Sequence, residues 1–210
     1  MSRAKQIYEM AAASVGWAAL VLQFVLVLQY FLPLGVPPGE SVLRFFTFFT
    51  IVTNTLVALI FTLSALGRSE SFFTRPSVKA AAVVYVAVVM IVYETMLRGL
   101  WSPQGAQLVA DIALHDVIPV AYAVYWRVFV RKVRLRWSCV LVWLAYPLGY
   151  CAWVFAHAAT SGFYPYPFLD AGEIGYGAAL VNCAAILLLF GIVGVVVVAM
   201  SRALSRPKAP

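Results

Sequence analysis

Hydrophobic residues run along this chain in six long, continuous stretches separated by short polar segments. A helix needs about 20 apolar residues to cross the hydrocarbon core of a membrane, and each stretch has about that length. The expected spans are residues 8–32, 42–66, 78–98, 107–126, 137–158 and 174–201. Because the apolar runs are continuous rather than alternating, the pattern excludes a membrane β-barrel. It predicts an all-α, polytopic membrane protein, with six transmembrane helices in a single domain over residues 1–210.

The composition agrees with this pattern and excludes several classes of protein. Hydrophobic residues make up 64% of the chain and charged residues 11%, so too few polar side chains exist to cover a water-facing surface. No separate soluble domain is expected. The net charge of +7 does not indicate a nucleic acid partner, because the basic residues lie at helix ends, where membrane topology explains them. The first span follows Arg3 and Lys5 as a secretory signal would, but its length predicts a retained anchor.

The distribution of lysine and arginine predicts how the spans face. Of the 15 basic residues, all except Arg44 and Arg98 precede span one, follow span six, or lie between spans two and three or between spans four and five. Arg206 and Lys208 belong to the group after span six. Both termini are therefore expected to be cytoplasmic, which requires an even number of spans. The short loops and the high content of alanine and valine favour a bacterial inner membrane as the location.

Polar and ionisable residues inside a span are costly, so each of them indicates a partner or a function. They collect in the outer half of the predicted bundle, and the inner half has almost none. The set comprises Thr47, Thr50 and Asn54 in span two, Glu94 and Arg98 ending span three, Asp111, His115 and Asp116 in span four, His157 ending span five, and Asp170, Glu173 and Asn182 around the start of span six. We expect a polar pocket that opens toward the external leaflet and is closed toward the cytoplasm.

Span four carries the most informative spacing. Asp111 and His115 are four residues apart and share a helix face. A carboxylate at this spacing can accept a proton from one imidazole nitrogen and leave the other nitrogen free as a base; a buried imidazole that only joins two helices explains the pattern equally well. Asp116 points about 100° away from His115. Pro119 is expected to kink the helix and leave the carbonyl of His115 without its usual partner.

The remaining polar residues have structural alternatives. Thr47 and Asn54, seven residues apart, share one face of span two. A threonine in such a place often bonds to the carbonyl four residues earlier or packs against a neighbouring helix. Glu94 and Arg98 have the order and spacing of an ion pair at the rim.

The outer connection SGFYPYPFLD, residues 161–170, alternates prolines with aromatic residues. Tyr164, Tyr166 and Phe168 are candidates for a lid or for substrate contacts, and the alternative is an aromatic anchor in the headgroup layer. No sequence pattern indicates a metal site, a phosphate loop or a cofactor. The three cysteines lie in apolar runs without a CxxC pair, which indicates helix packing.

Three stretches stand in a characteristic order: RFFTFFTIVTN at 44–54 in span two, LHDVIP at 114–119 in span four, and YPFLD at 166–170 before span six. With six spans and both ends inside, the sequence resembles the family of androgen-induced protein and androgen-dependent TFPI-regulating protein, including its bacterial relatives. The resemblance implies a six-helix enzyme that hydrolyses fatty acid esters of hydroxy fatty acids with an intramembrane threonine nucleophile and a histidine on another helix.

Carried over by position, the family threonine corresponds to Thr47 and the histidine to His115, with Thr50 as a second candidate for the nucleophile. The expected reaction is hydrolysis of a carboxylic ester in a lipid by acyl transfer. Asp111 is the first candidate to orient His115, and Asp116 the second. Asn54, Asn182 or a tyrosine are candidates for oxyanion donors. The rival interpretations are a proton-coupled or small-solute transporter, and a membrane adaptor without enzymatic activity; the oligomeric state is open.

Overall fold

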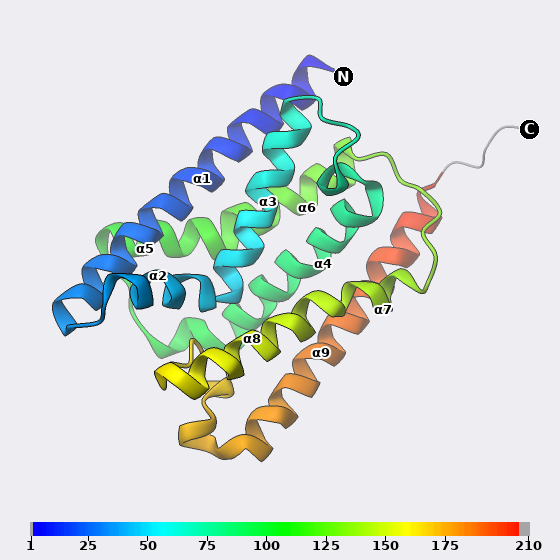
Figure 1. Cartoon of the computed structure of the whole chain (residues 1–210). Coiled ribbons are helices and arrows are strands. Elements are labelled where there is room, and N and C mark those ends of the chain that lie inside the picture. The colour runs from blue at the N-terminus through cyan, green and yellow to red at the C-terminus, as the bar shows by residue number, and fades with distance from the viewer. Residues whose placement is uncertain (1, 206–210) are drawn as a thin grey trace, which may run out of the picture.

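The computed structural model describes residues 2–205, and within that range the chain forms helices and no β-strand. The α-helices are α1 (Arg3–Phe31), α2 (Pro38–Thr47), α3 (Phe49–Ala65), α4 (Pro76–Val92), α5 (Gly105–Ile112), α6 (Ile118–Phe129), α7 (Cys139–Trp143), α8 (Ala145–Ser161) and α9 (Ala171–Ala203), as Figure 1 shows. Two π-turns, Tyr93–Leu97 after α4 and Ala113–Val117 between α5 and α6, interrupt the regular helices. The all-α class predicted from the sequence is confirmed.

Five continuous helical stretches are long and apolar enough to cross a membrane. They are Arg3–Leu34, Pro76–Leu100, Gly105–Phe129, Cys139–Ser161 and Ala171–Ala203. The predicted span 42–66 is different, because α2 and α3 meet at an angle of 78°. The expectation of one straight helix there was wrong. Residues 2–205 thus contain five membrane-length helices, or six if the bent pair counts as one span.

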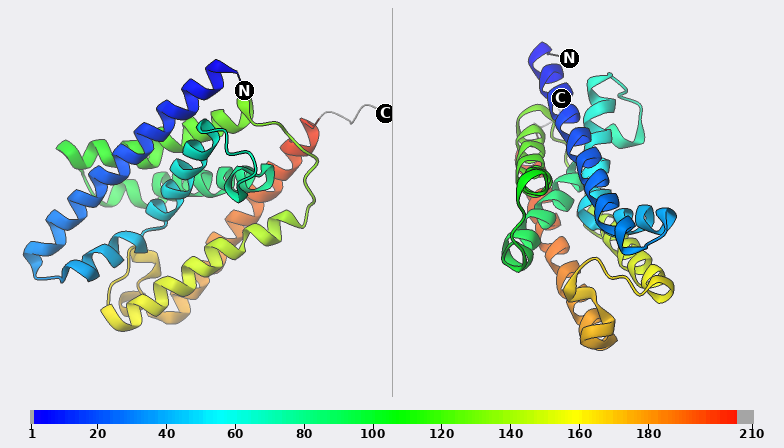
Figure 2. Two further views of the ribbon diagram at one scale, coloured as in Figure 1. Left: turned by 45° about the horizontal axis from the view of Figure 1, so that its top comes forward. Right: turned by 90° about the vertical axis from the view of Figure 1, so that its left-hand side faces the viewer.

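The helices run up and down between two ends of the bundle. α1 begins and α9 ends at what we term the terminal end, which lies at the upper side of Figure 1 together with the connections 66–75 and 130–138. The opposite end, which we term the site end, holds the connections 32–37, 101–104 and 162–170. The left view of Figure 2 shows α2 crossing the site end from α1 to the start of α3.

Basic residues separate the two ends. Of the described lysines and arginines, only Arg44 on α2 and Arg98 after α4 lie at the site end, which is the separation that the sequence predicts. Arg206 and Lys208, which the sequence analysis also counted, lie outside the described residues.

α3 forms the centre of the core. Val57, Ala58 and Ile60 on this helix are completely buried. α1 approaches it closely at Gly16, where an added Cβ would lie 3.3 Å from Cβ of Ala58; small residues permit such contacts between membrane helices. This packing holds the first turn of α3 inside the protein rather than at its surface.

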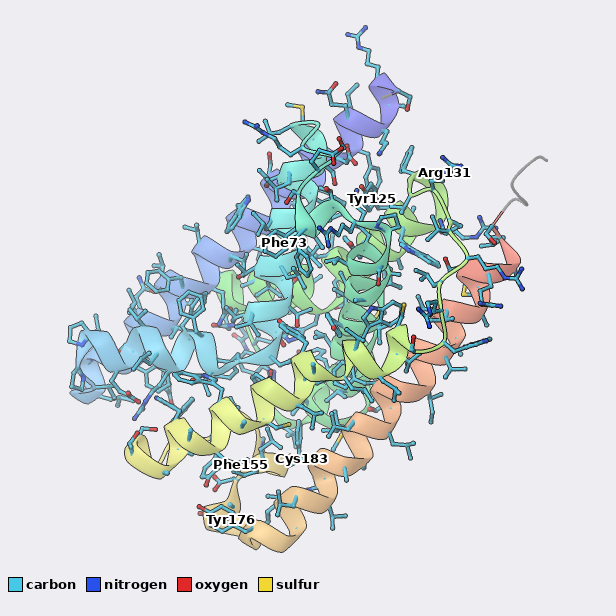
Figure 3. All side chains as sticks on the ribbon, turned by 45° about the vertical axis from the view of Figure 1, so that its right-hand side comes forward. Phe73, Tyr125, Arg131, Phe155, Tyr176 and Cys183 are labelled. Carbon is cyan, nitrogen blue, oxygen red and sulfur yellow. The ribbon has the colours of Figure 1, made fainter. Side chains whose placement is uncertain are left out.

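A buried polar cluster lies at the terminal end. The Tyr125 hydroxyl, labelled in Figure 3, donates to Glu9 (2.7 Å) and accepts from the ammonium group of Lys79 (3.0 Å). Glu9 is completely buried and Lys79 is 7% exposed. The expectation that this half of the bundle holds almost no polar residues was therefore wrong. The sequence analysis assigned Lys79 to the connection between spans two and three, but α4 begins at Pro76 and Lys79 lies in its first turns, inside the core.

Candidate active site

The helix break at Phe48 places two threonines on different helices. Thr47 ends α2, Phe48 is extended with φ −79° and ψ 124°, and Thr50 is the second residue of α3. The carbonyl of Thr47 accepts a hydrogen bond from the hydroxyl of Tyr150 (2.7 Å), and the N–H of Thr50 donates to the hydroxyl of Tyr166 (3.4 Å). Two tyrosines that are distant in sequence thus form hydrogen bonds with backbone groups that would bond to each other's neighbours within a continuous helix.

The hydroxyl of Thr50 contacts the imidazole of His115, with Oγ1 and Nε2 3.2 Å apart. The other ring nitrogen, Nδ1, lies 3.0 Å from the carbonyl oxygen of Asp111 and 3.2 Å from its carboxylate Oδ1. Both neighbours of Nδ1 are acceptors, so we assign the proton to Nδ1. Nε2 is then unprotonated and accepts the hydroxyl proton of Thr50. The hydrogen bond of Nδ1 goes to the backbone carbonyl of Asp111, while the buried Oδ1 is close to the imidazole but has no hydrogen-bond partner. The residues thus lie in the order in which a hydrolase triad places its nucleophile, base and acid.

Tyr93 completes this arrangement. Its hydroxyl donates a hydrogen bond to Oδ2 of Asp111. Its ring stacks on the imidazole of His115, with centroids 3.8 Å apart and planes at 11°. The sequence analysis gave Tyr93 no role, because a tyrosine near the end of an apolar span is typical of any membrane protein.

The π-turn at Ala113–Val117 explains how His115 is held. The N–H of Ile118 bonds to the carbonyl of Ala113, five residues earlier. The same five-residue spacing would pair the N–H of residue 119 with the carbonyl of Leu114, but Pro119 has no N–H. The carbonyl of Leu114 accepts a hydrogen bond from the side-chain amide of Asn54 instead (3.1 Å). The same amide donates to the carbonyl of Thr50 (2.8 Å).

Asn54 therefore joins the turn that carries the nucleophile candidate to the turn that carries the histidine. It does not line the large cavity described below. The sequence analysis expected the freed carbonyl at His115, because it assumed the four-residue step of an α-helix.

Thr47 lies on the other side of the break. Its hydroxyl donates to the carbonyl of Leu43 (2.8 Å), which is the structural alternative for threonine that the sequence analysis named. The face shared by Thr47 and Asn54 requires a continuous helix, and the bend at Phe48 removes it. The structure brings Thr50, and not Thr47, to His115.

The other candidates have different partners. Asp116 and Glu94 both pair with Arg98, with 2.7 Å between Asp116 and the guanidinium. Asp116 is thus turned away from His115, as its angular position on the helix indicates. His157 lies 3.2 Å from the carboxylate of Glu40, and Asn182 donates to the carbonyl of Phe168 (2.9 Å). These residues fasten α2 to α8 and the 162–170 connection to α9.

A cavity of about 580 Å³ opens beside the triad. Thr50, Asp111, His115 and Tyr93 lie in its wall, and α1 forms the opposite side. This volume is within the usual range for small-molecule sites. The space is large enough for a substrate with a hydrocarbon chain.

A second, narrow crevice of about 60 Å³ lies between α3, α4, α8 and α9. Its lining is almost entirely apolar, and it shares Thr50, Tyr93, Leu97 and Tyr166 with the large cavity. Thr50 therefore lies where the two spaces meet. Phe155 and Cys183, labelled in Figure 3, mark the α8 and α9 side of this region.

The 162–170 connection contributes side chains to the walls of both spaces. Tyr164 and Tyr166 line the large cavity, and Phe168 lines the crevice and stacks on Tyr166. The hydroxyl of Tyr166 lies 3.5 Å from Oγ1 of Thr50. Burial raises the pKa of Tyr166 above its ordinary value, which keeps this hydroxyl protonated and able to donate.

Within residues 2–205 there is no cluster of three or more His, Cys, Asp or Glu side chains that could hold a metal ion. Comparisons with protein-family models, with curated proteins and with solved structures found no match.

Proposed function

We propose that the protein is a membrane-embedded ester hydrolase with Thr50 as the nucleophile and His115 as the general base. The observation that carries the proposal is the contact between Thr50 and His115 at the wall of the large cavity, with Asp111 on the far nitrogen of the imidazole. A threonine hydroxyl is a weak nucleophile by itself and needs an adjacent base. The arrangement supplies that base in the tautomer the reaction requires.

The reaction proceeds in two steps. Oγ1 of Thr50 attacks the ester carbonyl carbon while Nε2 of His115 takes the hydroxyl proton, and His115 then gives this proton to the departing alcohol oxygen. The acyl group remains on Thr50. Water attacks the acyl-threonine, its proton passing to His115 and then to Oγ1, so that the fatty acid is released and Thr50 is restored.

Asp111 and Tyr93 support the imidazole during both steps. The carboxylate stabilises the imidazolium that forms when His115 takes a proton. The Tyr93 ring, lying parallel to the imidazole, offers its π face to the same cation. Both side chains therefore favour the charged histidine of the transition state over the neutral histidine of the resting enzyme.

Tyr166 is the proposed oxyanion donor. Its oxygen already accepts the N–H of Thr50, which leaves its own proton for another acceptor. A carbonyl under attack by Thr50 would lie beside this hydroxyl, because the two oxygen atoms are 3.5 Å apart. Thr50 also lies in the first turn of α3, where the helix dipole favours negative charge. These contacts support Tyr166 over Asn54 and Asn182, whose amides bond elsewhere.

The proposed setting is a bacterial inner membrane, with six spans, both termini in the cytoplasm and the site in the external leaflet. The positive charge at the terminal end supports this orientation, and the bent α2–α3 pair counts as the sixth span. Ester lipids would place their chains in the large cavity and the apolar crevice, with the carbonyl at Thr50. The resemblance to the androgen-induced protein family supports the same reaction, and it points to esters of hydroxy fatty acids or similar amphiphilic esters.

Transport is the main rival interpretation. The buried Glu9–Tyr125–Lys79 cluster would offer a transported solute or proton a second polar contact at the terminal end. However, Val57, Ala58 and Phe61 lie between Asn54 and that cluster along α3, and all three are at most 1% exposed. A solute path would have to cross this apolar layer. This apolar layer and the large cavity at the site end support a reaction at one end of the bundle over transport through it.

The decisive experiment is covalent labelling of the purified protein with a fluorophosphonate lipid probe. We expect labelling of the wild-type protein and its loss in Thr50→Ala and His115→Ala, whereas Thr47→Ala should retain it. Thr50→Ser should keep labelling, because it preserves the hydroxyl. Mass spectrometry should locate the adduct on residue 50. An adduct on Thr47, or full labelling of Thr50→Ala, would remove Thr50 from the mechanism.

A further inference from the structure

Acidic residues dominate the site end. Every described acidic residue except Glu9 and Glu70 lies there, against only two basic residues, Arg44 and Arg98. Among the described residues that line the large cavity, the ionisable carboxylate is Asp111, and no lysine or arginine contributes to the wall.

Both arginines at this end are already paired. Arg98 lies over the ring of Tyr93 at the edge of the cavity, with 5.0 Å between its guanidinium carbon and the ring centroid. It binds the two carboxylates of Glu94 and Asp116. Arg44 lies over Phe31 and Phe163, whose rings line the cavity, and binds Glu40 at 2.8 Å. Each guanidinium therefore has its charge balanced by at least one neighbouring carboxylate.

Apart from Asp111 and His115, the polar part of the cavity wall consists of neutral groups. Gln107 donates to Gln23 across the space between α5 and α1 (2.9 Å), and Tyr30, Trp101 and Tyr164 lie nearby in the wall. Amides and hydroxyls of this kind bind alcohols and esters well. They compensate the desolvation of a buried carboxylate less fully than a paired lysine or arginine would.

From this charge distribution, and resting on the proposed function, we infer that the cavity selects acyl esters that carry no free carboxylate. The substrate would be an uncharged lipid ester whose alcohol portion bears hydroxyl, ether or ester groups. A fatty acid ester of a hydroxy fatty acid in its ionised form has a carboxylate at the end of the alcohol portion. Inside the cavity that carboxylate would find no lysine or arginine in the wall, and it would lie in the field of Asp111 and of the other acids at the site end, where like charges repel.

The test compares two substrates that differ only in this charge: the oleoyl ester of a hydroxystearic acid, and the same molecule as its methyl ester. At a pH at which the free acid is ionised, we expect kcat/KM to be about tenfold or more higher for the methyl ester. The double variant Glu94→Gln/Asp116→Asn frees Arg98 and should narrow this ratio severalfold. Glu173→Gln, which removes a charge from an exposed site outside the cavity wall, should leave it unchanged.

A binding measurement separates this inference from the proposed reaction. Brominated stearic acid and its methyl ester quench tryptophan fluorescence, and Trp101 lies in the cavity wall; Trp101→Phe gives the background. The inference is supported if the brominated methyl ester binds at least tenfold more tightly than the free acid and if this ratio is smaller in the double variant. If that result is found but neither of the two oleoyl esters is cleaved, only the hydrolase proposal fails. Equal or stronger binding and cleavage of the free acid overturns the inference and leaves the hydrolase intact.

Discussion

The ring of Tyr93 lies parallel to the imidazole of His115, at 3.8 Å between centroids, while its hydroxyl binds the carboxylate that faces the same imidazole. One side chain thus contacts both the proposed base and the residue proposed to orient it. Tyr93 and His115 each lie in a π-turn, on neighbouring helices. π-turns often occur at functional sites, because the extra residue turns a side chain out of the regular helical register.

Substitutions can separate the effect of the stacked ring of Tyr93 from that of its hydroxyl. Tyr93→Phe keeps the stacked ring and removes the hydrogen bond to Asp111, and we expect kcat to fall about tenfold, the equivalent of one charged hydrogen bond. Tyr93→Leu removes both contacts, and kcat should fall by a further factor of about five to ten. The measurement is single-turnover hydrolysis of a lipid ester. Equal rates for the leucine variant and the wild type would show that Tyr93 does not act on His115.

Tyr166 should affect the rate rather than substrate affinity. Tyr166→Phe removes the proposed oxyanion donor, and loss of one such donor typically lowers kcat by about 10²–10³. KM should change little, because the donor acts on charge that develops only in the transition state. Tyr164→Phe is the matched control in the same connection and should stay within about twofold of wild type. A rise in KM with unchanged kcat would instead indicate that Tyr166 binds the ground state.

Asn54 should prove important for stability. Asn54→Leu leaves the buried carbonyl of Leu114 without its donor, which costs about 1–3 kcal/mol of unfolding free energy. Loss of activity should accompany it, because the same amide sets the distance between Thr50 and His115. Thermal unfolding in detergent measures the first effect and ester hydrolysis the second. Asn182→Leu, which removes a half-buried bond to Phe168, is the comparison and should cost less.

The cluster at the terminal end should influence stability without influencing the reaction. Tyr125→Phe removes the hydroxyl that joins Glu9 to Lys79, and leaving these buried charged groups short of a partner should cost about 3 kcal/mol. Tyr8→Phe removes one hydrogen bond from a half-buried tyrosine to the carbonyl of Ala121 and should cost about 1 kcal/mol. Turnover measured well below the unfolding temperature should be unchanged in both. A selective loss of turnover in Tyr125→Phe would connect the two ends of the bundle.

Much of the fold was predictable because its determinants are local. Continuous apolar stretches set the membrane-length helices, and Pro76 and Asp170 mark where two of them begin. Asp170 accepts the N–H groups of Gly172 and Glu173, as an N-cap residue does. The pairing of Asp111 with His115 was also foreseeable, since both residues lie within five positions of one helix.

The choice between Thr47 and Thr50 was not predictable in the same way. Residues 44–54 contain neither proline nor glycine, so no local signal places a break at Phe48. At the break, Tyr150 donates to the carbonyl of Thr47 and Tyr166 accepts the N–H of Thr50, and both tyrosines lie more than a hundred positions further along the chain. The contact of Tyr93 with Asp111 likewise depends on two π-turns, and no pattern of residues in the sequence predicts them.

The break at Phe48 also determines when during synthesis the site can form. A chain that has been inserted into the membrane only as far as α6 already contains Thr50, Asp111 and His115. It lacks the two tyrosines that hold the start of α3, and we expect the apolar run 42–66 to remain a straight span until α8 and the 162–170 connection are in place. The proposed nucleophile and its base would then meet only in the finished chain, after the helices that surround the site are in place.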